Sequence, residues 1–244
     1  MNLVEDSLEI REMFMAELQI LERLYQKLYH TDLSIRIYAI RLFAHLSQDS
    51  SRPLVDSFLN EVFLNGLKHI LEIGGSKSAM GLAVGCCANA LCDSPEAYKM
   101  VLKHPITVKI FEIVATGVAS IPIQDHVAQF LQNLASLCPV HLVINLLGLN
   151  LLEVFLIFIQ QCITSANKLT RLMKVLRGFI GLGYDLEQEY GCNPVLNELN
   201  NRQELLHTVM TSISNRIHNK EASPVILVEY KELESMLSPL SQHQ

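Results

Sequence analysis

The side chains best suited to bind another molecule are polar groups spaced three or four residues apart on otherwise aliphatic segments. Side chains at this spacing share one face of an α-helix, so each segment would present a short row of hydrogen-bonding groups. In chain order, the candidates are Tyr38, Arg41, His45, Asn89, His126, Gln129, Asn133, Lys174 and Arg177. The Arg and Lys residues among them form charge-assisted hydrogen bonds with carboxylate or phosphate oxygens. A face that meets only solvent is the competing interpretation.

One group in this series consists of small residues. Ala83, Cys86 and Ala90 fall at the corresponding positions, with Asn89 beside them. A surface lined by such short side chains would admit a bulky apolar side chain of a partner. The same pattern is expected where two helices pack closely. The sequence leaves both interpretations open.

No motif in the sequence predicts catalysis or cofactor binding. No GxSxG, HExxH, P-loop or GxGxxG signature lies in a strand–turn–helix setting, and no segment has the alternation typical of a strand. Gly178, Gly181 and Gly183 form GxxGxG at a predicted helix end. Helix termination or close helix packing explains these glycines better than phosphate binding does. We therefore expect a protein that is not an enzyme, with no catalytic residue, no cofactor and no metal.

The cysteines and histidines do not have the spacing of metal ligands. None of the six cysteines belongs to a CxxC pair, most lie in apolar helical segments, and the nine histidines are dispersed. The first residues, MNLVEDSLEIREMF, lack the basic and apolar regions of a signal peptide. We therefore expect reduced, buried thiols in a cytoplasmic or nuclear protein.

The charge balance argues against nucleic acid as a partner. The chain has 19 Lys and Arg residues against 25 Asp and Glu residues, a net charge of −6, and no Trp. Proteins that bind duplex nucleic acid gain affinity from clustered Lys and Arg side chains that neutralise phosphates. The expected partner is therefore another protein.

The apolar stretch VINLLGLNLLEVFLIFIQQC (143–162) is long enough to cross a membrane, but it contains its own helix signals. Asn150 followed by Glu153 has the spacing of a capping box, in which each side chain accepts a hydrogen bond from a backbone N–H of the first turn. Gly148 would end the preceding helix. The stretch therefore predicts no membrane segment but two helices joined by a turn, at about 139–147 and 151–166.

Two independent series of residues recur with a period of about 45 residues. A Leu followed by a small residue closes four predicted helices, at intervals of 45, 43 and 48 residues: Leu46, Leu91, Leu134 and Leu182. Positions in a second type of helix recur at intervals of 43 and 45 residues: Leu67, Ile110 and Phe155. A repeat of this length with two or three helices is typical of α-solenoids.

The segment FLQNLAS (130–136), followed by a new long helix, resembles the armadillo family. Asn133 falls on that family's Asn position in the third helix of a repeat, whereas His45, Ala90 and Gly181 occupy it elsewhere. The resemblance implies an all-α fold: a right-handed α-solenoid of about four armadillo-like (HEAT-like) helical repeats with an N-terminal capping helix. The expected domains are a capping helix at 1–32, repeats at 33–219, and a C-terminal helix and tail at 220–244.

The two flanks of the repeats have their own predictions. Residues 4–29 form an amphipathic helix, with one apolar face made of Ile10, Phe14, Leu18, Leu21, Tyr25 and Leu28. This helix would cap the first repeat, and a coiled-coil dimer is the alternative. A short helix is expected at 223–237, with frayed residues after it.

In armadillo-like proteins the third helices line a concave surface that holds an extended peptide, so the resemblance assigns the polar positions above to partner binding. The implied function is that of a non-enzymatic adaptor or scaffold. Its partner would be an extended or helical protein segment with acidic or phosphorylated residues. The alternatives are a homo-oligomerisation module, such as a homodimer, and a HEAT-type nucleic-acid-binding protein, which the charge disfavours. The nuclear-import type is also disfavoured, because its regular ladder of Trp and Asn is missing.

Overall fold

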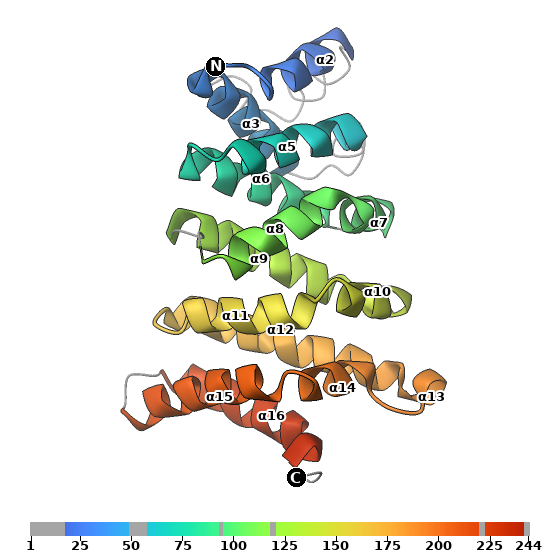
Figure 1. Cartoon of the computed structure of the whole chain (residues 1–244), viewed down its shortest axis with the longest axis vertical. Helices are drawn as coiled ribbons and strands as arrows, with labels where there is room; N and C mark the ends of the chain where they lie inside the picture. The colour runs from blue at the N-terminus through green and yellow to red at the C-terminus, as the bar shows by residue number, and fades with distance from the viewer. Residues whose placement is uncertain (1–17, 49–57, 93–94, 118–120, 220–222, 242–244) are drawn as a thin grey trace. The chain divides into compact units, whose positions relative to one another are not determined.

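The structure is a computed structural model that describes residues 18–48, 58–92, 95–117, 121–219 and 223–241 (Figure 1). These residues form helices and turns, and no strand occurs among them. In chain order the helices are α2 (Leu18–Lys27), α3 (Leu33–Gln48), α5 (Glu61–Ile73), α6 (Lys77–Ala90), α7 (Pro95–Lys103), α8 (Pro105–Ala115), α9 (Ile121–Ser136), η2 (Val140–Leu142), α10 (Val143–Gly148), α11 (Leu151–Gln161), α12 (Ala166–Asp185), α13 (Glu187–Tyr190), α14 (Pro194–Asn200), α15 (Gln203–His218) and α16 (Pro224–Ser241).

The helices recur with the predicted period. We call α3, α6, α9, α12 and α16 the third helices, and α2, α5, α8, α11 and α15 the second helices. The first four third helices begin at residues 33, 77, 121 and 166, so the period of about 45 residues is confirmed. Short first helices precede the later second helices: α7, α10 and α14.

The C-terminal helix repeats this order as well. The helices α14, α15 and α16 follow one another as short, long and long, so the helix expected at 223–237 is the third helix of a further group. It continues to Ser241, and residues 238–241, which we expected to be frayed, are helical. The remaining residues of that expected tail lie outside the described residues.

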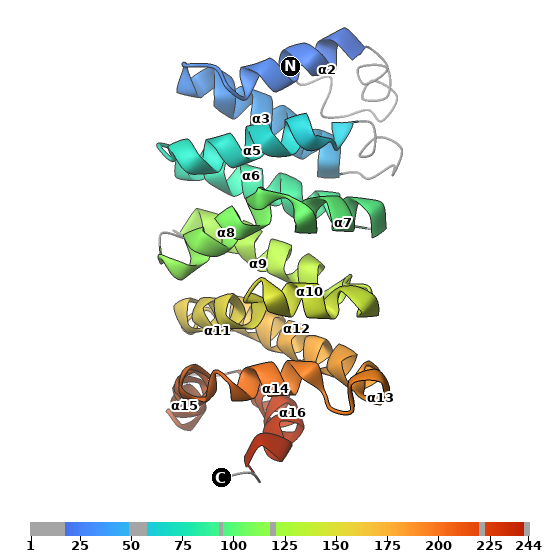
Figure 2. The same cartoon turned by 45° about the vertical axis from the view of Figure 1, so that its right-hand side comes forward.

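The chain divides into two compact units, each of which has two layers of helices. The first unit comprises residues 1–113 and 119–130, and the second comprises residues 114–118 and 131–244. In the first unit α3 packs on α6 and α2 on α5; in the second unit α12 packs on α16 and α11 on α15 (Figure 2). Third helices thus pair with third helices and second helices with second helices, and each layer buries the apolar face of the other.

The core of the first unit includes the described part of the N-terminal helix. Tyr25 of α2 and Leu28, which follows the helix directly, are buried. The Tyr25 ring stacks on Phe43 of α3, with 5.5 Å between ring centroids. The apolar face predicted for this helix is therefore buried at Leu21, Tyr25 and Leu28, whereas Ile10 and Phe14 lie outside the described residues.

Helix α6 packs closely on α3 because its residues are small. Ala83, Cys86 and Ala90 are completely buried, and burial raises the pKa of the Cys86 thiol to about 12. The structure therefore decides between the two interpretations of this small-residue group: these are packing positions. Gly85 has the same role towards α9, because a Cβ atom there would lie 2.7 Å from Nδ1 of His126.

The apolar stretch at 143–162 forms two main helices, as predicted, but its turn is built differently. Asn150 has a φ of 59°, a left-handed conformation that Asn adopts more readily than most other residues. Gly148 is the last residue of α10, where the sequence predicted the helix to end, but its φ is not positive. The Asn150 side chain makes no capping hydrogen bond. The predicted capping box is therefore wrong, and Asn150 ends the first helix by its backbone conformation.

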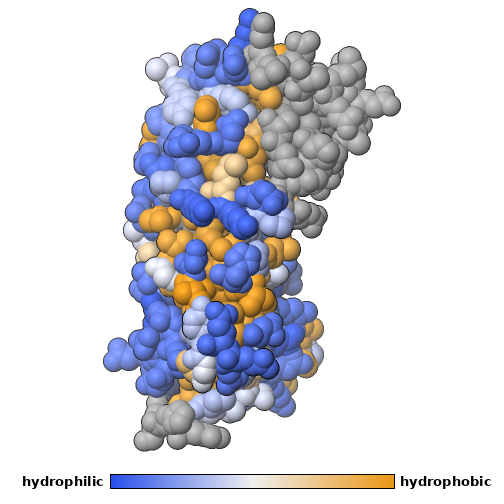
Figure 3. Space-filling model, turned by 90° about the vertical axis from the view of Figure 1, so that its right-hand side faces the viewer, coloured by the Kyte–Doolittle hydropathy of each residue, from blue (hydrophilic) through white to orange (hydrophobic). Residues whose placement is uncertain are grey.

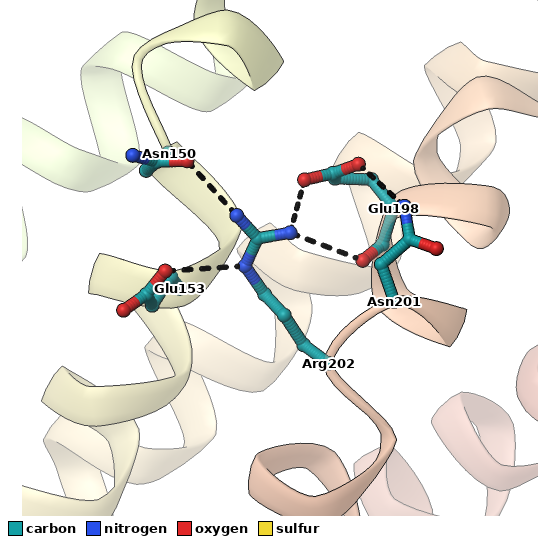
Figure 4. Close-up of polar contacts among 5 residues, drawn as sticks. All are labelled: Asn150, Glu153, Glu198, Asn201 and Arg202. Atoms are coloured by element: carbon teal, nitrogen blue, oxygen red, sulfur yellow. Dashed lines mark hydrogen bonds and ion pairs between the residues drawn. The ribbon is translucent and has the colours of Figure 1, made fainter.

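Instead, the side chain of Arg202 contacts both predicted cap residues, Asn150 and Glu153 (Figure 4). Its Nη2 donates to Asn150 Oδ1 at 2.9 Å, and its Nε lies 3.5 Å from Glu153 Oε2. On the other side the guanidinium pairs with Glu198. The arginine joins the α10–α11 turn to the α14–α15 turn, and it comes 52 residues after Asn150 in the sequence. Short-range spacing gives no information about a contact over that separation.

Among the described residues, no single helix combines the length and the apolar composition needed to cross a membrane. The segments Ile123–Ser136 and Val140–Gly148 meet that requirement only as a pair, and they are bent by 113° at the break between them.

Of the three glycines in the GxxGxG segment, only Gly183 is closely packed, since nothing lies within 4 Å of a Cβ atom at Gly178 or Gly181. A Cβ atom at Gly183 would overlap Oδ1 of Asn193. That oxygen accepts hydrogen bonds from the backbone N–H groups of Val195 and Leu196 at the start of α14, at 3.0 and 3.1 Å. Nδ2 of Asn193 donates to the Ile180 carbonyl oxygen of α12 at 3.1 Å. The missing side chain at Gly183 therefore lets one buried amide tie α12 to α14.

Candidate peptide-binding surface

In the first unit, α3 presents its predicted residues on one accessible face. Tyr38 is 53% exposed, Arg41 is exposed and His45 is partly exposed. The Cζ atom of Arg41 lies 6.0 Å from the centroid of the Tyr38 ring, at the outer limit of cation–π attraction. The opposite face of the helix buries Ile40 and Phe43 in the core. The structure thus brings these three predicted residues together.

The predicted residues of α6 and of the start of α9 are less accessible. Asn89 is partly exposed, and its Nδ2 donates to Ser47 Oγ of α3 at 3.0 Å. His126 is partly exposed and packs against Gly85, and desolvation by burial lowers its pKa. Gln129 is partly exposed. Asn89 and His126 therefore take part in helix packing in addition to any contact with a partner.

In the second unit, the predicted residues are engaged by the protein itself. Asn133 is buried, with 7% of its surface exposed. Lys174 Nζ lies 3.5 Å from Glu229 Oε1, and Arg177 Nη1 lies 3.3 Å from Glu229 Oε2. Arg177 also pairs with Glu232. Since Glu229 is only 6% exposed, two cations of α12 compensate a buried carboxylate of α16.

A groove of about 450 Å³ lies beside this ion-pair cluster, between the end of α9, α12 and the start of α16. It is lined by Gln132, Ser136, Asn167, Thr170, Arg171, Lys174, Val175, Ser223 and Val225. None of these lining residues is acidic, two are cationic, and five carry neutral hydrogen-bonding groups. We call this feature the α12 groove.

Our sequence analysis predicted only Lys174 among the residues that line the α12 groove. Asn167, Thr170 and Arg171 come seven, four and three residues before Lys174 on α12, and therefore on its face of the helix. That periodicity was available in the sequence. The contribution of Ser223 was not, because it depends on how α16 packs against α12.

Apolar side chains are exposed next to the groove. Val225 and Val228, one turn apart on α16, are 51% and 53% exposed. Figure 3 shows one face of the molecule, on which hydrophobic side chains lie among hydrophilic ones.

The chemistry of the described residues offers no metal centre. Among them, no group of three or more His, Cys, Asp or Glu side chains is placed to hold a metal ion. None of the six cysteines, all of them among the described residues, forms a disulfide bond; four are buried, and Cys92 and Cys192 are partly exposed. The prediction of buried thiols therefore holds for four of the six. Burial also raises the pKa of Cys87 well above its usual value.

Comparison with known proteins supports the fold. No family model matches the sequence, and no curated protein is similar to it. The designed armadillo repeat protein YIII(Dq)4CqI superposes with a TM-score of 0.70 at 13% identity, over 96% of this chain and 88% of that chain. The designed armadillo repeat protein YIII(Dq.V1)4CPAF, in complex with the peptide (KR)4, superposes with a TM-score of 0.68 at 14% identity, over 97% and 89% of the two chains. An engineered protein superposes with a TM-score of 0.56 at 15% identity, over 89% of this chain and 98% of that chain. This chain therefore has the all-α fold of armadillo-like repeat proteins, as the sequence predicted.

Proposed function

We propose that this protein is a non-enzymatic adaptor or scaffold that holds an extended segment of a partner protein in the α12 groove. The observation that carries the proposal is the groove itself, which follows third helices of an armadillo-like fold and is lined mainly by polar side chains. A designed protein of this fold has been solved with a peptide, so the fold can accommodate such a ligand. We further propose a cytoplasmic or nuclear location, which is consistent with six cysteines that form no disulfide bond.

The charge of the groove favours an acidic or phosphorylated segment. Arg171 and Lys174 are both exposed, and no lining residue is acidic. Lys174 and Arg177 share Glu229, and Arg177 also pairs with Glu232, so this ion-pair cluster is balanced and Arg171 supplies the positive charge of the groove. The partner chemistry is therefore opposite in sign to that of the basic peptide (KR)4 in the designed complex.

The test is affinity purification with mass spectrometry, using the tagged full chain and two charge-reversal variants. Arg171→Glu changes the α12 groove. Lys99→Glu is the matched control, because Lys99 is an exposed cation on α7, in the first unit. We expect specific partners to be retained by Lys99→Glu and lost by Arg171→Glu. Equal circular dichroism spectra and melting temperatures establish that both variants are folded.

The same set of partners for all three proteins would contradict the proposal. Arg177 is unsuitable for this experiment, although its side chain lies on the same helix. A reversal there would place a new carboxylate against Glu229 and Glu232, and would weaken the packing of α16 as well as any partner contact.

Self-assembly is a second candidate function, because the last two helices hold a partly apolar groove. This groove has a volume of about 410 Å³ and lies between α15 and α16; its apolar lining consists of Leu206, Met210, Leu237 and Leu240. A second copy of the chain is the partner that this alternative requires. Sedimentation velocity over a range of protein concentrations separates the two, since a monomer at all concentrations would exclude assembly.

A further inference from the structure

The polar face of α12 is held in a fixed register. Asn167, Thr170, Arg171 and Lys174 line the α12 groove from one side of this 20-residue helix. Four residues of the same segment are at most 1% exposed: Leu169, Leu172, Met173 and Leu176. Because these side chains are enclosed by the core, rotation of α12 would expose them, and the polar groups keep their places relative to one another.

The set of donors along this face exceeds what a single carboxylate needs. A guanidinium, an ammonium, the hydroxyls of Thr170 and Ser223 and the amides of Asn167 and Gln132 all line one groove. A carboxylate has two oxygens and a single charge. A phosphorylated side chain has three strongly accepting oxygens and a charge of about −1.5 to −2 at neutral pH. The donor set and the charge of the groove match the phosphate better.

The buried carboxylate of Glu229 positions the ammonium group of Lys174. The ammonium lies 3.5 Å from Glu229 Oε1, yet the lysine side chain is 54% exposed, whereas Glu229 is 7% exposed. One side of the ammonium is therefore paired and the other meets the groove. Arg177 pairs with Glu229 and also with Glu232, so the charges of these four side chains balance, and Arg171 adds one further positive charge to the lining of the groove. Glu229 is thus a positioning residue for the anion site.

An apolar contact lies beside the cations. Val225 lines the same groove and is 51% exposed, and Val228 follows it one turn later with 53% of its surface exposed. The groove volume of about 450 Å³ lies within the range of sites that enclose a small ligand, so it has room for more than the phosphate group itself. A residue next to the phosphorylated one would contact these valines.

We propose that the α12 groove binds a phosphorylated serine or threonine side chain of the partner segment, with an apolar residue next to it. Arg171 and Lys174 contact the phosphate, Thr170 and Asn167 complete its hydrogen bonds, and Val225 contacts the apolar neighbour. This inference rests on the proposed function, since it names the chemical group that the same groove recognises.

The experiment uses the full chain and three immobilised libraries of ten-residue peptides. The central residue is phosphoserine, serine or glutamate, and the flanking positions are random. Bound peptides are sequenced, and the affinity of the best ones is measured by fluorescence anisotropy. We expect phosphoserine peptides to bind about tenfold more tightly than their serine counterparts, with Val, Ile or Leu enriched next to the phosphoserine. Inorganic phosphate is titrated in parallel as a competitor.

Substitutions that replace a charged side chain with the neutral side chain of Gln test whether the phosphopeptide binds in the α12 groove. Arg171→Gln and Lys174→Gln should each weaken phosphopeptide binding by about tenfold, whereas Lys99→Gln on α7 should leave it unchanged. Glu229→Gln removes the negative charge behind Lys174. The Glu229→Gln variant should therefore still bind phosphoserine peptides more tightly than serine peptides, although its affinity for both changes. If the carboxylate were essential for the structure, this preference would be lost.

The outcomes separate the two proposals. Equal binding of the phosphoserine and serine libraries, or of the phosphoserine and glutamate libraries, overturns phosphate recognition and leaves peptide binding standing. Binding of inorganic phosphate as tightly as of the phosphopeptides overturns recognition of a protein segment. If no library binds and Arg171→Glu also retains every cellular partner, both this inference and the proposed function are wrong.

Discussion

The third helices α3 and α12 both carry cations on an accessible face, but the helices packed against them treat these cations differently. On α3, Arg41 is exposed, and the neighbouring α6 contains no acidic residue. On α12, Lys174 and Arg177 face Glu229 of the neighbouring α16. Cations at similar places in the repeat thus face a neighbouring third helix without acidic residues in the first unit and share a buried carboxylate of that helix in the second.

The packing of the two helix pairs differs in the same way. Helix α6 meets α3 through small buried residues such as Ala83 and Cys86, which bring the two helices close together. Helix α16 meets α12 through larger side chains and a buried carboxylate, and a groove remains at its start. The comparison teaches that a repeat position has no fixed role: the neighbouring third helix decides whether it serves packing or a polar surface.

The largest expected effect is a loss of stability at the contact between α12 and α14. Gly183→Ala would place a methyl group on the Asn193 amide, which caps α14 and is bonded to α12. Overpacking and loss of the cap should together lower the free energy of unfolding by about 3 kcal/mol. Gly178→Ala is the matched control on the same helix, because nothing lies within 4 Å of a Cβ atom there. It should raise the stability by up to about 1 kcal/mol, and urea unfolding measures both.

The second effect contrasts the arginines of the two helices. Arg177→Ala leaves the Glu229 carboxylate buried with only Lys174 beside it, so we expect a loss of about 2 kcal/mol of stability. Arg41→Ala removes an exposed side chain and should change stability by less than about 0.5 kcal/mol. Equal losses for the two variants would show that the ion pairs of α12 and α16 contribute nothing specific.

A smaller effect is a pH dependence that originates in the first unit. Burial lowers the pKa of His104 and of His126 below 6.5. Nδ1 of His104 also accepts a hydrogen bond from the Ile106 N–H at 3.1 Å, which requires the unprotonated nitrogen. The unfolded chain therefore takes up protons before the folded one does. The contribution of these two histidines to the free energy of unfolding is therefore fully present above about pH 6.5, and it is lost as the pH falls below that value.

Hydrogen exchange followed at about pH 7.5 and 5.5 measures this effect, as faster exchange in α7 and α9 at the lower pH. The double variant His104→Gln, His126→Gln should show a smaller difference between the two conditions. A pH dependence that the double variant leaves unchanged would assign the effect to other groups.

The smallest effect concerns thiol chemistry and reports on the α3–α6 contact without changing it. Burial raises the pKa of Cys86 to about 12 and that of Cys87 well above its usual value, so neither should react with iodoacetamide in the folded protein. The partly exposed Cys92 and Cys192 should react first. Peptide mass spectrometry resolves the order, and early labelling of Cys86 would mean that α6 opens readily from α3.

Local patterns in the sequence predicted the helices well, because they depend on residues close together in the chain. The Leu series and the second helix series gave the repeat of about 45 residues that the starts of α3, α6, α9 and α12 show. The stretch at 143–162 was correctly divided in two, although for the wrong reason. Asn150 is a turn residue through its φ of 59°, and its side chain is used by Arg202.

The candidate surface was predicted in part. Tyr38, Arg41 and His45 do share an accessible face of α3, as their spacing indicated. Asn133 is buried although it falls on the armadillo Asn position, because its surroundings in the second unit enclose it. The sequence analysis did not predict Arg171 and Thr170, which also line the α12 groove. Their helical spacing was present in the sequence, but the alignment of repeats selected Lys174 and Arg177, about one turn later on the helix.

The sequence by itself determined the helices, their order and their apolar faces, since helix propensity and the 3.6-residue period act over a few residues. Only the tertiary structure decided that α6 is a packing helix, that Arg202 links two turns, and that Lys174 and Arg177 compensate Glu229 of α16. The physical reason is the same in each case. The free energy of a buried or partly buried polar group depends on the groups packed against it, and in this fold those come from a helix about one repeat away.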